Sequence, residues 1–376
     1  MSLTIAVAQE TLSGENRVAL VPETAKKFAK LGAKIQFQKN AGNSANFLDN
    51  DYSDITATSD LTSTYQNAGL ILRVTPPSNE EIAAMPDNCV LVGMLKPYES
   101  KERLDLLNSK KITAFALELL PRISRAQSMD ALSSQGACSG YQCALIAASN
   151  SSKFFPMLTT AAGTMRPARA LIIGAGVAGL QAIATCKRLG AMVEGYDVRS
   201  AAKEQVESLG AKFVDTGVSA DGAGGYAREL TEAEKAQQAE RLAKAVANAD
   251  VLITTAAIPG KKAPIIVTEK MVQGMKYGAV IVDMAAETGG NCVGTKAGEI
   301  IITDNNHVKI IGPTNLPSKM PTHASELFAK NLYNFLSPFI KDGNFTLDWE
   351  DEVVKGSLLC KDGSVQHEIV KKVLGI

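Results

Sequence analysis

The stretch that decides the fold is Ala170-Leu-Ile-Ile-Gly-Ala-Gly-Val-Ala-Gly-Leu-Gln-Ala182, an apolar run that enters a glycine-rich turn and leaves it as a helical pattern. Gly174, Gly176 and Gly179 have the spacing G-x-G-x-x-G. In a strand–turn–helix unit, the first glycine permits a tight turn, the second lets backbone approach a pyrophosphate, and the third lets helix pack on strand. The helix N-terminus adds free N–H groups. We therefore expect a phosphate-binding turn.

A second apolar run, Met192–Tyr196, follows the helix and ends on Asp197. Asp197 lies about 20 residues beyond the glycines, where a carboxylate accepts hydrogen bonds from an adenosine ribose. The order of strand, glycine turn, helix, strand and acidic residue predicts a dinucleotide-binding unit. The alternative is a glycine-rich turn in an α/β domain that binds no nucleotide.

Asp197 also bears on the choice of dinucleotide. A carboxylate at this position repels the 2′-phosphate of NADP(H), so the sequence favours NAD(H). Arg199 would attract that phosphate, but Asp197 occupies the ribose position itself. The alternative for Arg199 is a solvated residue at the start of a helix.

The composition limits the class of protein. The chain has 376 residues, 45% of them hydrophobic, with 39 basic and 39 acidic residues. This length suggests two or three domains, and the balanced charge gives no reason to expect a nucleic-acid partner. No apolar run approaches the roughly 20 residues that span a bilayer, so we expect no direct membrane insertion. The six scattered cysteines predict no metal site and suggest a reducing cytoplasm.

Strands and helices alternate on both sides of the glycine turn. We therefore expect an α/β protein with two doubly wound, Rossmann-like domains and a cleft between them that binds the ligand. The tail 345–376 is too short for a domain of its own. This predicts a discontinuous first domain, residues 1–133 and 322–376, and an NAD-binding domain at residues 134–321.

Two polar segments interrupt this rhythm. Residues 215–229 are glycine-rich, contain Tyr226 and exceed the usual connection of 2–6 residues. We interpret them as a lid or a partner-contacting loop, the alternative being an insertion without a role. The second segment, residues 122–135, would hold a nicotinamide and its ribose if it faced the cleft; alternatively it is a solvated interdomain helix. Its polar candidates are Arg122, Arg125, Gln127, Asp130 and Ser133.

Histidine is scarce, with none before His307. A dehydrogenase of hydroxy or amino acids moves a proton as well as a hydride, usually through His or Lys. Arg73 and Lys96 lie near strand ends and would be substitutes, but the first domain is expected to lack a histidine. Hydride exchange between two nicotinamides needs positioning and exclusion of water instead. The pattern therefore favours a nicotinamide partner.

The chain resembles a known family over essentially its whole length. This family is the NAD(H)-binding component (domain I, or alpha-1 subunit) of proton-translocating NAD(P) transhydrogenases, and it is related to alanine dehydrogenase. The motifs that carry the resemblance are Gly14-Glu-Asn-Arg-Val-Ala19, Arg122-Ile-Ser-Arg-Ala-Gln-Ser-Met-Asp130, Gly174–Ala182, Gly224-Gly-Tyr226, Ile258-Pro-Gly260 and Glu287-Thr-Gly-Gly-Asn-Cys292.

The resemblance implies roles for particular residues. It assigns nicotinamide and ribose contacts to the segment at 122–133, with Arg122, Gln127 and Asp130 as the catalytic set. It places Tyr226 on a loop that closes over NAD(H). The complete cofactor-binding set that it implies is Arg122, Gln127, Asp130, Ser133, Gly174, Gly176, Val177, Ala178, Gly179, Asp197, Val198, Arg199, Tyr226 and Ala257.

The resemblance also implies an assembly. Members of the family form a homodimer, dock a separate NADP(H)-binding component, and act with a membrane-spanning component that carries protons. The hydride passes directly from NADH to NADP+ with Re/Si specificity, at the cytoplasmic face of the inner membrane. The chain stops at Ile376 without membrane helices, as in a separately encoded subunit or a shortened chain.

Two rival functions stay open. One is an alanine-dehydrogenase-like oxidoreductase that acts alone. That family uses a lysine and a histidine from the first domain, whereas Arg73 stands near the expected lysine here, which counts against this rival. The other is a module that senses NAD(H) without catalysis.

Overall fold

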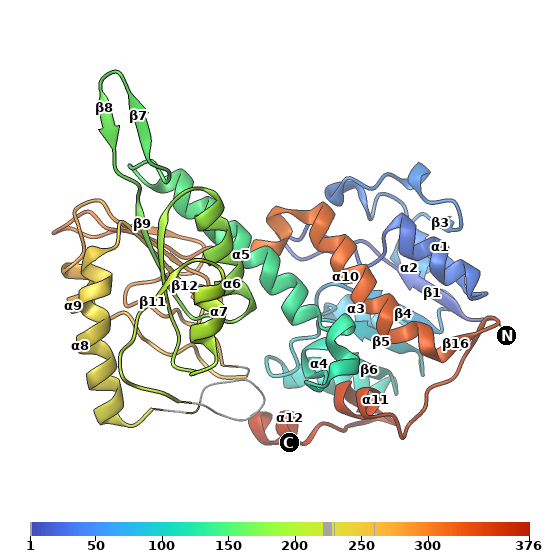
Figure 1. The fold of residues 1–376 in the computed structure, drawn as a ribbon. Coiled ribbons are helices and arrows are strands. Elements are labelled where there is room, and N and C mark those ends of the chain that lie inside the picture. Colours follow the sequence, from blue (N-terminus) through green and yellow to red (C-terminus); the bar gives the residue numbers. More distant parts are fainter. Residues whose placement is uncertain (1, 221–227, 229, 259) are drawn as a thin grey trace. The chain divides into compact units, whose positions relative to one another are not determined.

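The computed structural model describes residues 2–220, 228, 230–258 and 260–376, and the chain forms two compact units (Figure 1). Unit 1 combines Met1–Gln135 with Pro317–Ile376, and unit 2 is Gly136–Leu316. Each unit is built around a mostly parallel sheet with helices on its faces. The predicted α/β class with two Rossmann-like units is therefore confirmed.

Unit 1 contains an eight-stranded sheet in the order β19-β18-β6-β5-β4-β1-β2-β3. Six parallel strands come from the N-terminal portion of the chain: β1 (Thr4–Val7), β2 (Lys34–Gln38), β3 (Thr56–Thr58), β4 (Leu70–Arg73), β5 (Val90–Gly93) and β6 (Thr113–Ala116). The C-terminal portion adds the antiparallel strands β18 (Leu358–Lys361) and β19 (Ser364–Val365) beside β6. Both ends of the chain thus share one sheet.

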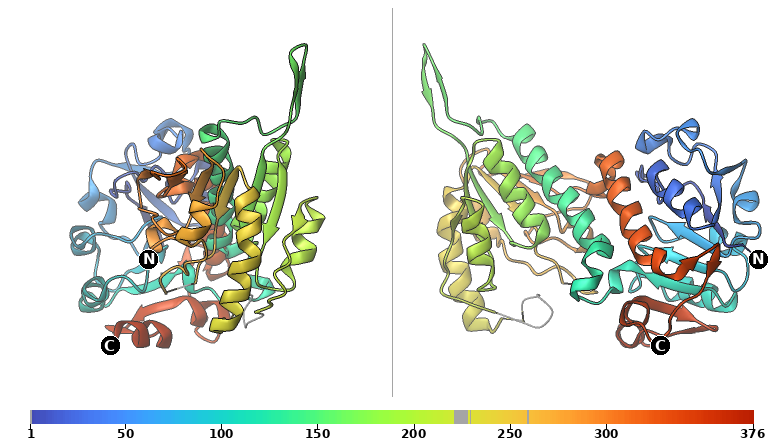
Figure 2. Two further views of the ribbon diagram at one scale, coloured as in Figure 1. Left: turned by 90° about the vertical axis from the view of Figure 1, so that its left-hand side faces the viewer. Right: turned by 45° about the vertical axis from the view of Figure 1, so that its right-hand side comes forward.

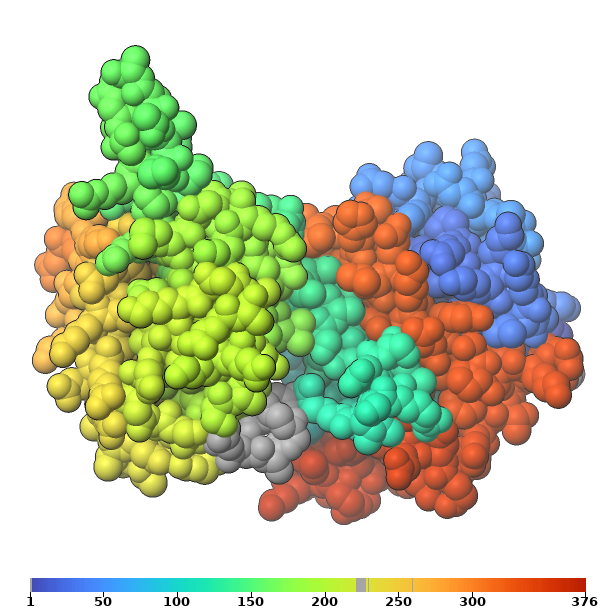
Figure 3. All heavy atoms as spheres, in the orientation of Figure 1, coloured from blue at the N-terminus to red at the C-terminus, as the bar shows by residue number. Residues whose placement is uncertain are grey.

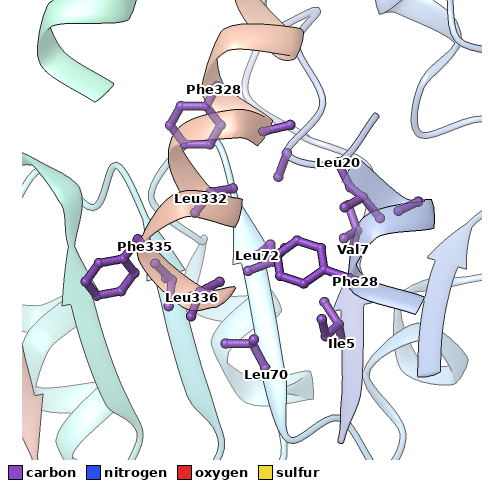
Figure 4. Packing of buried hydrophobic residues seen from close by; sticks show 14 of the residues in the cluster. Ile5, Val7, Leu20, Phe28, Leu70, Leu72, Phe328, Leu332, Phe335 and Leu336 are labelled. Carbon is purple, nitrogen blue, oxygen red and sulfur yellow. The ribbon is translucent and has the colours of Figure 1, made fainter. Parts of the chain in front are cut away.

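The helices of unit 1 cover this sheet. They are α1 (Pro22–Lys30), α2 (Leu61–Tyr65), α3 (Asn79–Ala84), α4 (Lys101–Ser109), α10 (Pro321–Leu336), α11 (Glu352–Ser357) and α12 (Glu368–Leu374). Figure 4 shows how α10 packs Phe328, Leu332 and Phe335 beside Phe28 of α1, over strands β1 and β4. The spacing of these α10 residues places them on one helical face, and each is fully buried.

Unit 2 contains a seven-stranded sheet in the order β11-β10-β9-β12-β13-β15-β14. Its strands are β9 (Arg169–Ile173), β10 (Met192–Tyr196), β11 (Lys212–Phe213), β12 (Val251–Thr254), β13 (Val280–Asp283), β14 (Ile300–Ile302) and β15 (Lys309–Ile311). All pairs are parallel except β14 with β15. Numbered along the chain, the six parallel strands have the order 3-2-1-4-5-6 of nucleotide-binding Rossmann domains.

The helices of unit 2 cover both faces of its sheet. They are the part of α5 (Ala131–Asn150) from Gly136 onward, α6 (Val177–Arg188), α7 (Ala202–Ser208), α8 (Glu232–Asn248) and α9 (Glu269–Gln273). Because both faces are covered, central strand β9 is buried from Ala170 to Ile173, as expected for parallel sheets. Within the described ranges, no helix combines the length and apolar character needed to cross a bilayer.

A two-stranded hairpin, β7 (Leu158–Thr160) with β8 (Gly163–Met165), projects from the body of unit 2 (Figures 2 and 3). Every residue in its two strands is exposed. The sequence contains little sign of it, because its strands are short and pack against no core.

Candidate nucleotide-binding site

The glycine turn between β9 and α6 has the geometry expected of a phosphate-binding turn. Gly174 adopts a φ of +95°, in the left-handed region that favours glycine. A Cβ on Gly179 would lie 1.7 Å from the Gly174 carbonyl oxygen, so α6 packs as closely as a glycine permits. A Cβ on Gly176, in contrast, would meet nothing within 4 Å. The backbone at Gly176, which precedes the first residue of α6, is therefore open to a ligand.

The turn lies where the strand order of unit 2 reverses. Strand β9 is flanked by β10 on one side and by β12 on the other, so the chain leaves β9 at the switch point of the sheet. Ligands of open α/β sheets bind at this point, outside the carboxyl ends of the strands. The structure describes nine of the predicted cofactor-binding residues in unit 2, and each of them follows β9, β10 or β12 in the chain. They are Gly174, Gly176, Val177, Ala178, Gly179, Asp197, Val198, Arg199 and Ala257.

Asp197 directly follows β10 and is tied to the glycine turn. Its Oδ2 accepts the N–H of Ala175 at 2.7 Å. Burial alone would raise the pKa of Asp197, but hydrogen bonds from Arg199 and Ala175 outweigh it and lower that pKa. The carboxylate is thus ionised at neutral pH.

Arg199 is not a solvated residue at a helix start, which was one sequence-based interpretation. Its Nη2 lies 2.7 Å from Asp197 Oδ2, and its Nε lies 2.8 Å from Asp197 Oδ1. The backbone N–H of Arg199 adds a bond of 2.9 Å to the same Oδ1. The site therefore contains a cation paired with the carboxylate, and the sequence analysis did not predict this pairing.

A second set of residues, missed by sequence reasoning, holds the turn in place. Thr255, which follows β12, donates from its hydroxyl to the Gly174 carbonyl oxygen at 3.0 Å. Asn291 accepts the N–H of Ala256 and donates to the Ala256 carbonyl. The fully buried Asp283 at the end of β13 accepts the N–H of Asn291 at 2.7 Å. The only sequence signal was Asp283 at a strand end, shortly before the Glu287–Cys292 motif.

Helix α5 also approaches the turn within unit 2. A Cβ on Gly140 would lie 2.0 Å from the carbonyl oxygen of Ala178. The first turn of α6 is therefore supported from the side by a helix that only a glycine lets come so close.

In unit 1 the polar segment predicted from sequence is short and irregular. Residues Ser124–Met129 form a 3-10 turn, and Asp130 begins α5 by accepting the backbone N–H of Ser133 at 2.9 Å and its hydroxyl at 2.6 Å. Arg122 Nη1 lies 4.0 Å from Asp130 Oδ2. The structure thus brings Arg122, Asp130 and Ser133 together.

Gln127 is exposed, while its neighbours Ala126 and Met129 are buried. Helix α10 fixes the segment through Asn331, whose side chain donates to the Ser128 carbonyl oxygen at 2.9 Å. Arg125 points elsewhere and pairs with Asp351 at 2.5 Å. Arg125 is therefore separate from the group at Arg122, as its omission from the predicted cofactor set requires.

The residues considered as substitute acids or bases have other roles. Arg73 is fully buried; its guanidinium lies 3.0 Å from Glu10 and 2.7 Å from Glu81. Lys96 is exposed, and its backbone N–H donates to Glu118 at 2.7 Å. Burial raises the pKa of Glu118 to about 7, against the opposing bonds from Lys96 and Leu95. Because its guanidinium is held between two buried carboxylates, Arg73 stabilises the interior of unit 1 and is not available as an acid or base.

One expectation about histidine is wrong. His323 and His367 both belong to unit 1, because the C-terminal portion of the chain completes that unit. His323 is exposed in the first turn of α10. Nδ1 of His367 is buried without a hydrogen-bond partner, and burial lowers the pKa of this imidazole. Tyr226 and the glycines beside it lie outside the described residues.

Comparison with known proteins agrees with this geometry. Residues 6–139 match the model for the N-terminal domain of alanine dehydrogenase/PNT, and residues 143–368 match the model for its C-terminal domain. The chain is 45% identical to an alpha-subunit chain of the NAD(P) transhydrogenase of Rhodospirillum rubrum, over 96% of this chain and 97% of that protein. It is 43% identical to the corresponding alpha-subunit chain of Rickettsia prowazekii, covering 98% and 97%.

Solved structures give the same assignment. A transhydrogenase from Sinorhizobium meliloti superposes with a TM-score of 0.86 at 38% identity, covering 97% of this chain and 99% of that one. An L-alanine dehydrogenase superposes with a TM-score of 0.82 at 22% identity, covering 99% of each chain, which shows the shared fold. This chain therefore belongs to the alanine dehydrogenase/PNT family, in its branch of NAD(P) transhydrogenase alpha subunits.

Proposed function

We propose that this chain binds NAD(H) and passes a hydride directly from NADH to NADP+ held by a partner component of a proton-translocating transhydrogenase. The observation that carries the proposal is the switch-point turn of unit 2, where open backbone at Gly176 lies beside the ionised Asp197. The first turn of α6 presents N–H groups for a pyrophosphate, and Asp197 is the acceptor for ribose hydroxyls. These residues fit the adenosine diphosphate half of NAD(H).

We assign the nicotinamide half to the polar group of unit 1. Arg122 and Asp130 form a charged pair, Ser133 is held by Asp130, and Gln127 is exposed beside them. When bound, NAD(H) supplies the hydride at its nicotinamide ring. The work of these side chains is to orient the ring and its carboxamide, because the transfer needs a precise approach and no proton at the reacting carbon.

The partners follow from the family. Several relatives are described as alpha subunits, which implies a complex of several subunits. We propose that the chain forms a homodimer, docks an NADP(H)-binding component, and reaches the cytoplasmic face of the inner membrane through a membrane-spanning component that translocates protons. Closure of the Tyr226 segment over the nucleotide belongs to the same proposal.

The charges of unit 1 weigh against the alanine-dehydrogenase-like alternative. An amino or keto acid substrate needs a cation for its carboxylate and a group that moves a proton. Arg73 is buried between two carboxylates, and the largely buried Arg17 is paired with Glu15 at 2.7 Å. Each of these arginines is neutralised inside the unit. Hydride exchange between two nicotinamides demands only that the rings be oriented and water be excluded.

The test is to mix the purified chain with the NADP(H)-binding component and NADPH, and to follow reduction of an NAD+ analogue with a shifted absorbance. Reduction that requires both proteins supports the proposal. Oxidation of NADH by pyruvate and ammonia with this chain alone would support the alternative. Binding of NADH without transfer in the complete mixture would indicate a sensing module.

A further inference from the structure

Helix α10 carries a buried amide, Asn331, where the helix meets the polar segment of residues 122–135. Asn331 is 7% exposed. An amide at such a position lowers stability unless both its N–H and its carbonyl groups are bonded. Here Nδ2 of Asn331 donates to the Ser128 carbonyl oxygen at 2.9 Å, and Oδ1 accepts the Ser134 hydroxyl at 2.6 Å. One side chain of α10 thus holds the segment at two points.

The two points lie on either side of the start of α5. Ser128 directly follows Gln127 in the 3-10 turn. Ser134 directly follows Ser133 in the first turn of α5. Asn331 is not among the predicted cofactor-binding residues, but each point that it holds is next to one of them. It therefore fixes the backbone at Gln127 relative to the helical turn that carries Ser133.

Asn334, one turn further along α10, shares part of this task. It lies on the same face of the helix as Asn331, and its Nδ2 donates to the same Ser128 carbonyl oxygen at 3.0 Å. Asn334 thus supports one point of the segment, whereas Asn331 joins two. When Asn331 is replaced, the carbonyl of Ser128 keeps this donor, and the Ser134 hydroxyl keeps the Ala131 carbonyl oxygen at 3.3 Å. The fold therefore does not depend on Asn331 alone.

We propose that Asn331 is a positioning residue for hydride transfer: it holds Gln127 and Ser133 in one arrangement and touches no nucleotide itself. This inference rests on the proposed function. Its physical basis is that transfer between two rings depends steeply on their placement, so that a displacement of about 1 Å costs on the order of 100-fold in rate. A segment released from one of its two points need not unfold to shift by that much. The effect of Asn331 is therefore on the rate of transfer and not on the affinity for the adenosine half.

The experiment compares three variants of the full chain. Asn331→Leu removes both bonds and keeps a side chain of similar size. Asn334→Ala removes only the second donor to Ser128. Leu332→Ala is the stability control, because Leu332 is fully buried in the same helix and its truncation leaves a cavity. For each variant we measure the rate of transfer with the NADP(H)-binding component at saturating nucleotides, the dissociation constant of ADP by calorimetry, and the melting temperature.

We expect N331L to transfer hydride about tenfold more slowly than wild type, or slower still, with the dissociation constant of ADP unchanged within about twofold. N334A and L332A should keep rates within about threefold of wild type, although L332A should melt at a clearly lower temperature. Combining N331L with Q127N should slow transfer less than the product of the two single effects, because a displaced Gln127 side chain gains little from a fixed backbone.

A wild-type rate in N331L would overturn the proposal, as would independent effects of N331L and Q127N. An equal loss of rate in L332A would do the same, because any weakening of α10 would then slow transfer. If N331L does not fold, Ser134→Ala takes its place, since it removes one of the two bonds without changing α10. We expect that variant to lose about threefold or more in rate, and an unchanged rate contradicts the proposal.

Failure of the proposed function looks different in the same experiment. The wild-type chain would then bind no ADP, or would transfer no hydride with the NADP(H)-binding component present. A wild-type chain that binds ADP and transfers hydride, together with an N331L variant that does so equally fast, contradicts this inference alone.

Discussion

At the scale of single residues, the structure separates glycines that shape the turn from the glycine that faces a ligand. Gly179 has the Gly174 carbonyl oxygen where a Cβ would lie, and Gly176 has open space. The G-x-G-x-x-G spacing identified all three positions from the sequence. It could not reveal the pairing of Arg199 with Asp197, because either residue also occurs in solvated loops.

Alanine substitutions of Gly176 and Gly179 should have different effects, the first on NADH binding and the second on stability. Gly176→Ala should leave the melting temperature nearly unchanged and weaken NADH binding roughly tenfold, about 1.4 kcal/mol, because its methyl group occupies the ligand side. Gly179→Ala is the matched control. It should cost about 2 kcal/mol or more in unfolding free energy, because the methyl group meets a backbone carbonyl. Chemical denaturation and NADH fluorescence titration measure the two effects. An unfolded G176A would contradict the assignment of its open side.

Conservative substitutions of Gln127 and Asp130 should slow hydride transfer without lowering the stability of the fold. Gln127→Asn should slow hydride transfer to NADP+ by on the order of 100-fold if the ring shifts by about 1 Å, with an unchanged melting temperature, because the side chain is exposed. Asp130→Asn should also slow transfer yet keep the start of α5, since asparagine caps helices as well as aspartate. Asp130→Ala should additionally lose about 1 kcal/mol of stability. A Q127N variant that unfolds would favour a purely structural segment.

At the scale of elements, apolar runs predicted the buried parallel strands well. The apolar runs that begin at Ala170 and at Met192 match β9 and β10 within a residue or so. The sequence analysis identified no such run for strands β3, β7, β8 and β14. They are short edge or hairpin strands that no helix covers on both faces, so burial imposes no apolar pattern on them. The network from Asp283 to Thr255 was missed because it joins strands far apart in the chain.

Glu118 predicts a pH dependence of stability. Its folded-state pKa of about 7 lies above the ordinary value of 4.5. Between these values the folded state binds more protons than the unfolded state, so the contribution of this group to stability falls as pH rises. Glu118→Gln cannot ionise. Its stability relative to wild type should therefore increase from pH 5 to pH 8, by on the order of 1 kcal/mol. Urea unfolding at both pH values measures this, and a constant difference would contradict it.

At the scale of the whole molecule, the sequence predicted a discontinuous first domain, and the structure has a unit that contains both ends of the chain. It also brings His323 and His367 into unit 1. Direct hydride transfer between two nicotinamides needs no acid or base, so a histidine of unit 1 should not matter for it.

We therefore expect His323→Gln to leave the rate of hydride transfer to NADP+ within about twofold of wild type, in the assay with the partner component. A large loss of transfer in this variant would contradict the proposal that the residues of unit 1 only orient the nicotinamide.

The isolated chain should be a homodimer that does not oxidise NADH by itself. The dimer is an expectation from the family, and light scattering of the purified chain tests it. We expect the inactivity because Arg17 and Arg73, the buried arginines of unit 1, are already paired with carboxylates and offer no cation to the carboxylate of a substrate. Steady NADH oxidation by pyruvate and ammonia without a partner would count against this account.

The most direct test of the central claim is isotope transfer. The chain, its NADP(H)-binding component and NADP+ are incubated with NADH that carries deuterium at the pro-R position of the nicotinamide C4, and the NADPH formed is analysed by mass spectrometry and proton NMR. Direct hydride transfer with the proposed Re/Si specificity predicts that the deuterium appears at the pro-S position of NADPH C4 and none is lost to water. Unlabelled NADPH, or deuterium released into the solvent, would contradict it.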